Sequence, residues 1–276
     1  MSSAPESGQK GKKFLQNAVS CGVLAVIVLA ILGYQGIRKF GQNPGAYWFK
    51  KGLQYDLGKG VTQDYVEARD LYQKAADAGN PQAMNNLGLL YEQGQGGPQD
   101  YTKALHWYLK AANANNTKAM VNLAELYEDG SGTTQDYATA RDWYQKAASN
   151  GSSNALFHLG VLSANGYGES RDYAKAHELY QKAADKGEAR AMNNLGVFYE
   201  QGSGVTQDYA KARDWYQKAA NAGNARAMNN LAQLYEKGEG VTQDYTKARQ
   251  WYQRSADKGN ADAKQALSRL AALNGP

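Results

Sequence analysis

Two consecutive stretches of 36 residues decide the fold. Residues 191–226 have the sequence AMNNLGVFYEQGSGVTQDYAKARDWYQKAANAGNAR, and residues 227–262 have the sequence AMNNLAQLYEKGEGVTQDYTKARQWYQRSADKGNAD. Earlier segments align with them without insertion or deletion, and a half unit closes the series; these segments are 47–82, 83–118, 119–154, 155–190 and 263–276. Self-similarity at a fixed period of this size is typical of repeat proteins.

Each unit predicts two helices. The first helix has apolar residues at unit positions 1, 2, 5, 8 and 9, which is helical spacing. An invariant Gly, the usual C-terminal stop, follows it, and an invariant Asp, a good N-cap, precedes the second helix. The Gly residues are Gly58, Gly94, Gly130, Gly166, Gly202 and Gly238. The Asp residues are Asp64, Asp100, Asp136, Asp172, Asp208 and Asp244.

The units must stack, because one unit cannot bury its own apolar stripe. The sequence therefore predicts an all-α fold: a right-handed α-solenoid of six two-helix repeats, closed by a capping helix at about Ala263 to Leu273. In the first unit, Tyr47, Trp48 and Phe49 replace the Ala, Met and Asn of other units. We expect these rings to cap the solenoid, and the alternative is that they rest near a membrane surface.

The N-terminal segment differs from the repeats in composition. Residues 1–13 are polar and basic and predict a disordered lead, whereas residues 14–36 are apolar enough to predict one transmembrane anchor, followed by a linker at 37–46 before the solenoid at 47–276. A cleaved signal peptide is the alternative, but no small-x-small cleavage site follows the run. The basic residues before it favour a cytoplasmic N-terminus and periplasmic or extracytoplasmic repeats of an inner-membrane protein.

Charge and cysteine content exclude several classes of function. The net charge of +5 suggests nucleic-acid binding, but residues 1–46 hold five basic residues and one acidic residue and so carry +4 of it. The remaining 230 residues carry +1, so we expect no nucleic-acid partner. The single Cys, Cys21, lies in the apolar run, so the repeats have no disulfide and no Cys-ligated metal.

The repeat pattern resembles a known family. The consensus A-x-x-x-L-G-x-x-Y-x-x-G-x-G-V-x-Q-D-Y-x-K-A-x-x-W-Y-x-K-A-A-x-x-G-N is similar to the Sel-one-like repeat, a relative of the tetratricopeptide repeat, over residues 47–262. The resemblance implies a non-catalytic scaffold or adaptor that binds a protein or an extended peptide. Bacterial members with a membrane segment often act at the envelope, so an immunity protein that neutralises a secreted toxin is the alternative function.

The first helices also have a second face, at unit positions 3, 4, 7, 10 and 11. In two-helix solenoids the first helices line the concave wall, so we expect a groove here that binds a partner. Its candidate residues are Asn86, Asn122, His158, Asn194 and Asn230 at position 4; Phe157, Asn193 and Asn229 at position 3; and Glu92, Glu128, Glu200 and Glu236 at position 10. An Asn ladder suits a peptide backbone, and a Glu row suits a basic segment. Alternatively, the Asn residues only link helices and the Glu residues pair with Lys.

Nothing in the sequence supports catalysis or a cofactor. His106, His158 and His177 form no metal-binding pair, and the recurring G-x-G follows a helix rather than a strand, which favours a turn. We therefore expect no metal, no cofactor and no small-molecule substrate, with a hydrolase as the remaining enzymatic alternative.

Unit 155–190 departs most from the consensus, so Phe157 there is either an anchor for a partner or a product of drift.

Overall fold

The computed structural model describes residues 43–272, all of whose regular structure is helical. The first helix of each repeat is α2 (Pro44–Leu57), α4 (Pro81–Gln93), α6 (Thr117–Asp129), α8 (Ser153–Asn165), α10 (Ala189–Gln201) or α12 (Ala225–Lys237). The second is α3 (Tyr65–Asp77), α5 (Tyr101–Asn113), α7 (Tyr137–Ser149), α9 (Tyr173–Asp185), α11 (Tyr209–Asn221) or α13 (Tyr245–Asp257). Helix α14 (Ala261–Ala272) ends the series.

The helix boundaries follow the predicted start and stop residues. Each second helix begins after its invariant Asp, whose carboxylate accepts first-turn backbone N–H groups, as Asp100 does from Lys103 at 2.9 Å. Each first helix ends at its invariant Gly in the left-handed region, for example Gly94 with φ of 68°. Helix α4 begins at Pro81 with Asn80 as its N-cap, and the first helices begin two or three residues before the predicted unit boundaries.

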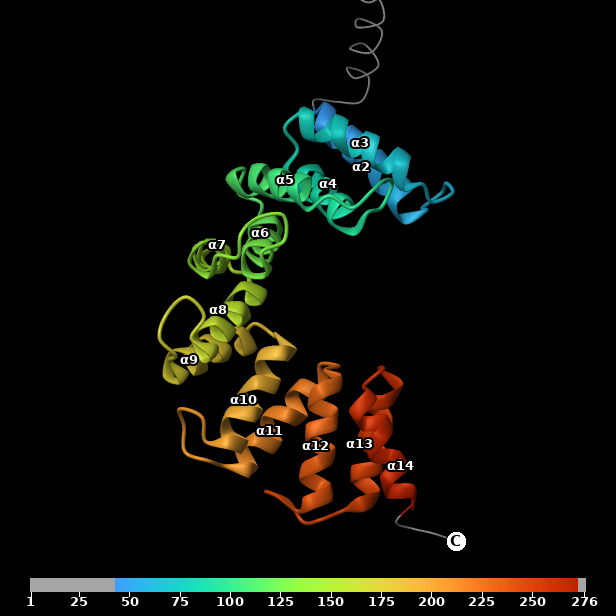
Figure 1. The fold of residues 1–276 in the computed structure, drawn as a ribbon. Helices are drawn as coiled ribbons and strands as arrows, with labels where there is room; N and C mark the ends of the chain where they lie inside the picture. The colour runs from blue at the N-terminus through green and yellow to red at the C-terminus, as the bar shows by residue number, and fades with distance from the viewer. Residues whose placement is uncertain (1–42, 273–276) are drawn as a thin grey trace, which may run out of the picture.

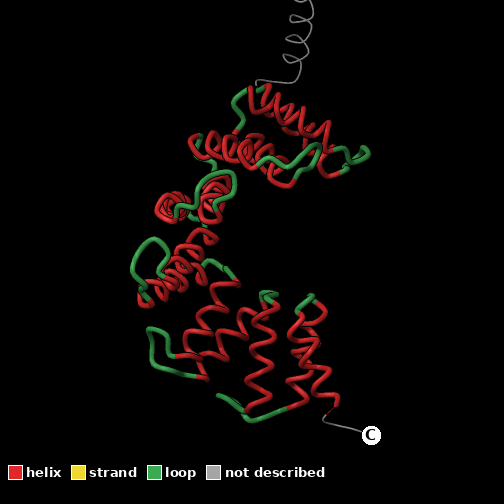
Figure 2. Tube along the Cα trace, in the orientation of Figure 1, coloured by secondary structure: helices red, strands yellow, loops and turns green. Residues whose placement is uncertain are grey.

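The helices stack into an arc (Figure 1). Helices α4, α6 and α8 lie on its inner side, and α5, α7 and α9 lie on its outer side. Long loops join the two helices of each repeat, and short turns join one repeat to the next (Figure 2). This is the predicted all-α solenoid.

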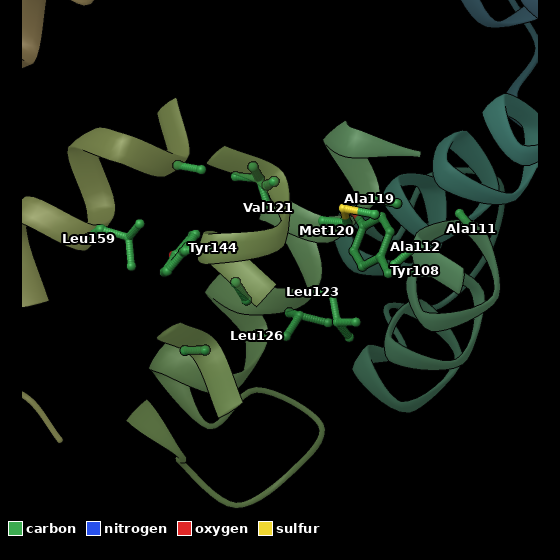
Figure 3. Close-up of a cluster of buried hydrophobic side chains, with 14 of the residues drawn as sticks. Tyr108, Ala111, Ala112, Ala119, Met120, Val121, Leu123, Leu126, Tyr144 and Leu159 are labelled. Atoms are coloured by element: carbon green, nitrogen blue, oxygen red, sulfur yellow. The ribbon is translucent and has the colours of Figure 1, made fainter. Parts of the chain in front are cut away.

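The core is continuous from repeat to repeat. In the cluster of Figure 3, Tyr108 from α5 packs with Leu123 and Leu126 from α6, and Tyr144 from α7 continues it toward Leu159 from α8. The Tyr at unit position 26 is fully or almost fully buried in all six repeats. Six of the 20 Tyr residues in the sequence are therefore core residues.

The first repeat and the last helix close the ends with polar surface. On α2, Lys51 and Gln54 are exposed, at the unit positions where α4 buries Leu87 and Leu90. On α14, Lys264 and Arg269 are exposed, as predicted for a capping helix.

No described helix between residues 43 and 272 has the length and apolar character needed to cross a bilayer. The predicted anchor at 14–36, the segment 1–13 and residues 37–42 of the predicted linker lie outside the described residues, whereas residues 44–46 of that linker belong to α2.

Candidate functional site

The inner side of the arc has a hollow of about 650 Å³ where α4 and α6 meet the start of α8. Asn86 and Leu89 from α4 and Val121 and Asn122 from α6 line it, together with Lys118. A second hollow of about 500 Å³ adjoins it toward α2. We call this surface, formed by unit positions 3, 4 and 7 of the first helices, the inner wall. Most of the predicted groove positions belong to it.

The Asn residues at unit position 3 are nearly buried and add little surface to this wall, although Asn85 lines both hollows. Asn193 and Asn229 are only 7% and 6% exposed, so the expectation that they line an open groove is wrong. The reason is that position 3 faces the next repeat. Asn230 donates a hydrogen bond from Nδ2 to Asn193 Oδ1 at 3.1 Å, and Asn122 makes the same bond to Asn85. These amides link adjacent first helices.

The Asn residues at unit position 4 are half-buried and also engaged within the solenoid. Asn86 donates from Nδ2 to the Tyr72 hydroxyl of the preceding repeat at 3.2 Å. Asn122, Asn194 and Asn230 hydrogen-bond the corresponding tyrosines. The structure thus follows the alternative in which the Asn residues link helices, and it leaves few of their amide N–H groups for a peptide backbone.

The acidic row at unit position 10 has a structural partner as well. Each carboxylate accepts a hydrogen bond from the buried tyrosine hydroxyl sixteen residues later, on the second helix of the same repeat. The donors are Tyr72 to Asp56 (2.7 Å), Tyr108 to Glu92 (2.5 Å), Tyr144 to Glu128 (2.7 Å), Tyr216 to Glu200 and Tyr252 to Glu236 (2.7 Å). In the alternative considered from the sequence, these acids pair with lysines; in the structure each accepts this tyrosine bond, and Glu236 also pairs with Arg269 at 2.6 Å.

The carboxylate and amide partners of the buried tyrosines also shift the pKa values of these tyrosines. Burial, and then the Glu92 carboxylate, raise the pKa of Tyr108 far above its ordinary value. In repeat 153–188, position 10 is Ala164, so Tyr180 has no such acid. Burial still raises the pKa of Tyr180, to about 12, against the opposing hydrogen bond from Asn194. In five repeats the buried tyrosine therefore donates a hydrogen bond to a carboxylate, and in repeat 153–188 it has no carboxylate partner.

His158 replaces the position-4 Asn and links repeats three and four. Its ring stacks on Tyr144 with centroids 4.9 Å apart, and its Nδ1 lies 3.2 Å from the Tyr144 hydroxyl. Its two nitrogens lie 3.4 Å from a Glu125 oxygen and 3.6 Å from a Glu128 oxygen. Burial is the largest influence on Glu128, but the hydrogen bonds from His158 and Tyr144 outweigh it and lower its pKa.

Phe157 is not a free anchor. It is half-buried, and the Arg190 guanidinium lies 4.3 Å above its ring centroid. Arg190 itself donates to Glu188 Oε1 at 2.8 Å and to Asn154 Oδ1 at 2.7 Å. Phe157 therefore packs against Arg190, which Glu188 and Asn154 hold in place. Its role in binding a partner protein stays a prediction.

The unusual loop of the same repeat supplies an interaction that the sequence did not indicate. Ser163, which stands where other repeats have Tyr, donates to Glu169 Oε1 at 2.9 Å. Arg141 from the preceding repeat and Lys175 also pair with Glu169, at 3.0 and 2.9 Å. The Ser that replaces Tyr and the Glu of the loop are therefore in contact with each other. The only signal for this contact in the sequence is that both residues depart from the consensus in the same repeat.

Among residues 43–272, no three acidic, histidine or cysteine side chains gather as a metal site.

The ladder of Asn amides ends at α14. Asn229 Oδ1 is buried without a described partner, because Ala266 occupies the position of the donor Asn. We expect Ala266→Asn to raise the free energy of unfolding by about 1 kcal/mol, since its amide can reach Asn229 as Asn122 reaches Asn85. Urea denaturation measures the gain. Ala271→Asn, on the exposed surface of α14, is the control and should be neutral or slightly destabilising. If both substitutions changed the free energy of unfolding equally, Ala266→Asn would not extend the series of hydrogen-bonded Asn amides.

Glu188 gives the solenoid a pH-dependent contact. It caps α10, and the hydrogen bonds from Arg190 lower its pKa. A depressed carboxyl pKa contributes stability that is present above the unfolded-state pKa and is lost as pH falls. We expect Glu188→Gln to lower the free energy of unfolding by about 1 kcal/mol at pH 7. The difference should shrink below pH about 4, in urea titrations at several pH values. A constant difference would contradict this assignment.

Comparisons with known proteins agree with this geometry. The family model described as Sel1 repeat matches six consecutive segments: 45–80, 81–116, 117–152, 153–188, 189–224 and 225–260. The match has the predicted period and begins two residues before the predicted boundaries. No curated protein sequence matches the chain.

Solved structures with the same fold include a Sel1 repeat protein from Oxalobacter formigenes, 38% identical, with a TM-score of 0.74 over 78% of this chain and 89% of that one. The protein c5321 of uropathogenic Escherichia coli, described as a protective antigen, is 36% identical with a TM-score of 0.74; the match covers 86% of this chain but only half of that one. The immunity protein Pa5087 from Pseudomonas aeruginosa is 23% identical, with a TM-score of 0.53 over 77% of this chain and 81% of that one, and shares the fold.

Proposed function

Because the chain belongs to the Sel1 repeat family, we propose that it is a protein-interaction scaffold whose inner wall binds a segment of a partner protein. The observation that carries this proposal is the pair of adjoining hollows on the inner side of α2, α4 and α6. They are lined by amides, one lysine and apolar side chains, among them Leu89, which is 36% exposed. Partly apolar surfaces of this kind, edged by polar groups, are typical of interaction sites.

A crosslinking experiment tests the proposal. A photoreactive amino acid is placed at Leu89 on the inner wall and, in a separate variant, at Val66 on the second helix α3, which is 66% exposed. We expect the Leu89 variant to crosslink one cellular protein, and unlabelled wild-type chain to compete for it. The Val66 variant controls for nonspecific capture. Equal capture from both positions, or no capture from Leu89, would overturn the proposal.

We also propose that residues 14–36 anchor this scaffold in a membrane, with the repeats on the extracytoplasmic side. The support is the sequence alone: an apolar run with basic residues before it. A reporter that is active only outside the cytoplasm, fused after Pro276, should be active. A reporter that is active only in the cytoplasm, fused at the same place, should be inactive, and the opposite result would reverse the orientation. The immunity role stays a second hypothesis, because the likeness to Pa5087 supports the fold alone.

A further inference from the structure

One row of side chains runs along the inner wall from repeat to repeat. It consists of the residues at unit position 7: Leu53, Leu89, Glu125, Val161, Val197 and Gln233. Leu53 and Leu89 line the hollows described above, and each member of the row is at least partly exposed. Glu125 is the only charged member, and it stands between apolar neighbours on both sides. A partner that follows this row meets apolar surface, then a carboxylate, then apolar surface again.

Within residues 43–272, Glu125 forms no ion pair with a lysine or arginine. Its side chain is 40% exposed, and its ion-pair contact among the described residues is the 3.4 Å approach of His158 Nε2. Burial is the largest cause of the raised pKa of Glu125; the adjacent His158 ring opposes it, and the nearby carboxylates of Glu92 and Glu128 add to it. Arg190 offsets this only in part, and its guanidinium is already bound by Glu188 and Asn154. At the centre of the inner wall, the Glu125 carboxylate therefore faces the His158 ring, and no lysine or arginine in the described part of the chain forms an ion pair with it.

We propose that the inner wall binds an extended segment in which a lysine or arginine, held by Glu125, lies between apolar residues that contact Leu89 and Val161. This deepens the proposed function and rests on it. Neighbouring first helices lie about 10 Å apart, and an extended chain advances about 3.3 Å per residue. One repeat thus corresponds to about three residues of the partner, so its pattern is apolar, two residues, basic, two residues, apolar.

The chemistry of the wall selects this partner over others. An acidic segment or a phosphate group would be repelled by the carboxylates of Glu92, Glu125 and Glu128. An uncharged apolar segment would bury the Glu125 carboxylate without a partner, which is costly. A lysine or arginine instead forms a charge-assisted hydrogen bond at a partly dehydrated site, where such bonds are strong. The Tyr hydroxyls that already bind Glu92 and Glu128 leave Glu125 as the carboxylate most available to it.

Synthetic peptides test the proposal directly. The probe is a capped nonapeptide of glycine and serine with leucine at its second and eighth positions and arginine at its fifth. Matched peptides have glutamine or glutamate in place of the arginine, or serine in place of both leucines. Binding to the full chain is measured by isothermal titration calorimetry. We expect the arginine peptide to bind at least tenfold more tightly than each of the other three.

Three variants assign that preference to Glu125. Glu125→Gln should reduce the preference for arginine over glutamine to less than twofold, and Glu125→Lys should make the glutamate peptide the tighter ligand. Glu67→Gln, on the exposed surface of α3, should change neither. Circular dichroism confirms that each variant is folded. The charge reversal keeps the test informative, because a merely misfolded variant gains no affinity for glutamate.

Failure of the basic-segment proposal can be distinguished from failure of the proposed scaffold function. Equal binding of the arginine and glutamine peptides, or no binding of any peptide at millimolar concentration, overturns the basic-segment proposal. The crosslinking at Leu89 does not depend on these peptides, so a partner captured there would leave the scaffold function standing. Loss of crosslinking at Leu89 would remove both.

Discussion

Replacing Tyr108 by Phe is expected to lower the free energy of unfolding by about 2 to 3 kcal/mol. The Tyr108 side chain is fully buried, and its hydroxyl donates to Glu92 Oε2 at 2.5 Å. Phe keeps the ring and its packing, so the loss isolates the hydroxyl. Without it, the Glu92 carboxylate and the Asn122 amide both lose a partner in a partly buried setting, and unsatisfied charged groups are the most costly.

Tyr180→Phe is the matched control. It removes the same hydroxyl from the same unit position, but Ala164 leaves no carboxylate there to lose its donor. We expect a loss of less than about 1 kcal/mol, which corresponds to the single hydrogen bond with Asn194. Urea denaturation followed by circular dichroism gives both values. If the two substitutions cost the same, the tyrosine–acid bond contributes nothing beyond the hydrogen bond that each tyrosine makes with an Asn amide.

The fold could be predicted from the sequence because it depends on local and repeated signals. Asp64 and Gly58, with their equivalents, mark helix ends by their own backbone chemistry. The regular period fixes the stacking, since each unit buries the same face against its neighbour. The first helices begin two or three residues before the predicted boundaries because N-cap side chains, such as those of Asn43 and Asn80, precede the first apolar residue of the unit.

The partners of the candidate site residues were harder to predict. A face at helical spacing indicates which side chains share a surface, but not which of them turn toward the next repeat. Asn193 and Asn86 lie on the predicted face, yet their amides bond within the solenoid. The carboxylate of Glu92 likewise bonds Tyr108, sixteen residues away, because the antiparallel helices of one repeat bring positions 10 and 26 together. Such contacts depend on the packing of helices, which periodicity alone does not determine.

The inner-wall row at position 7 shows the same distinction. Periodicity placed Leu89 and Glu125 on the groove side, but only the structure shows that Glu92 and Glu128 are already bound by tyrosines whereas Glu125 has no lysine or arginine partner. The candidate acid for a partner therefore changes from position 10 to position 7. Charge complementarity at an interface depends on which charges remain unpaired, and that is a property of the folded chain.

Replacing Gly240 by Ala is expected to lower the free energy of unfolding by about 3 kcal/mol, from a left-handed backbone and a steric clash together. Gly240 has φ of 65°, and a Cβ there would lie 2.5 Å from the backbone carbonyl carbon of Tyr209 on the preceding repeat. Relieving this contact requires the loop to move off α11, which also breaks the hydrogen bond from Arg213 to the Gly240 carbonyl oxygen.

The chain contains its own control at Gly60, which has the same unit position in the first repeat and a similar φ of 77°. No described atom lies within 4 Å of a Cβ added there, because no described repeat precedes this loop. Gly60→Ala should therefore cost only the left-handed conformation, about 1 kcal/mol. Urea denaturation of both variants separates backbone strain from stacking. Since the two positions share sequence and conformation, a larger cost at Gly240 assigns the difference to contact between repeats, and equal costs would show that these loops add nothing to the stacking.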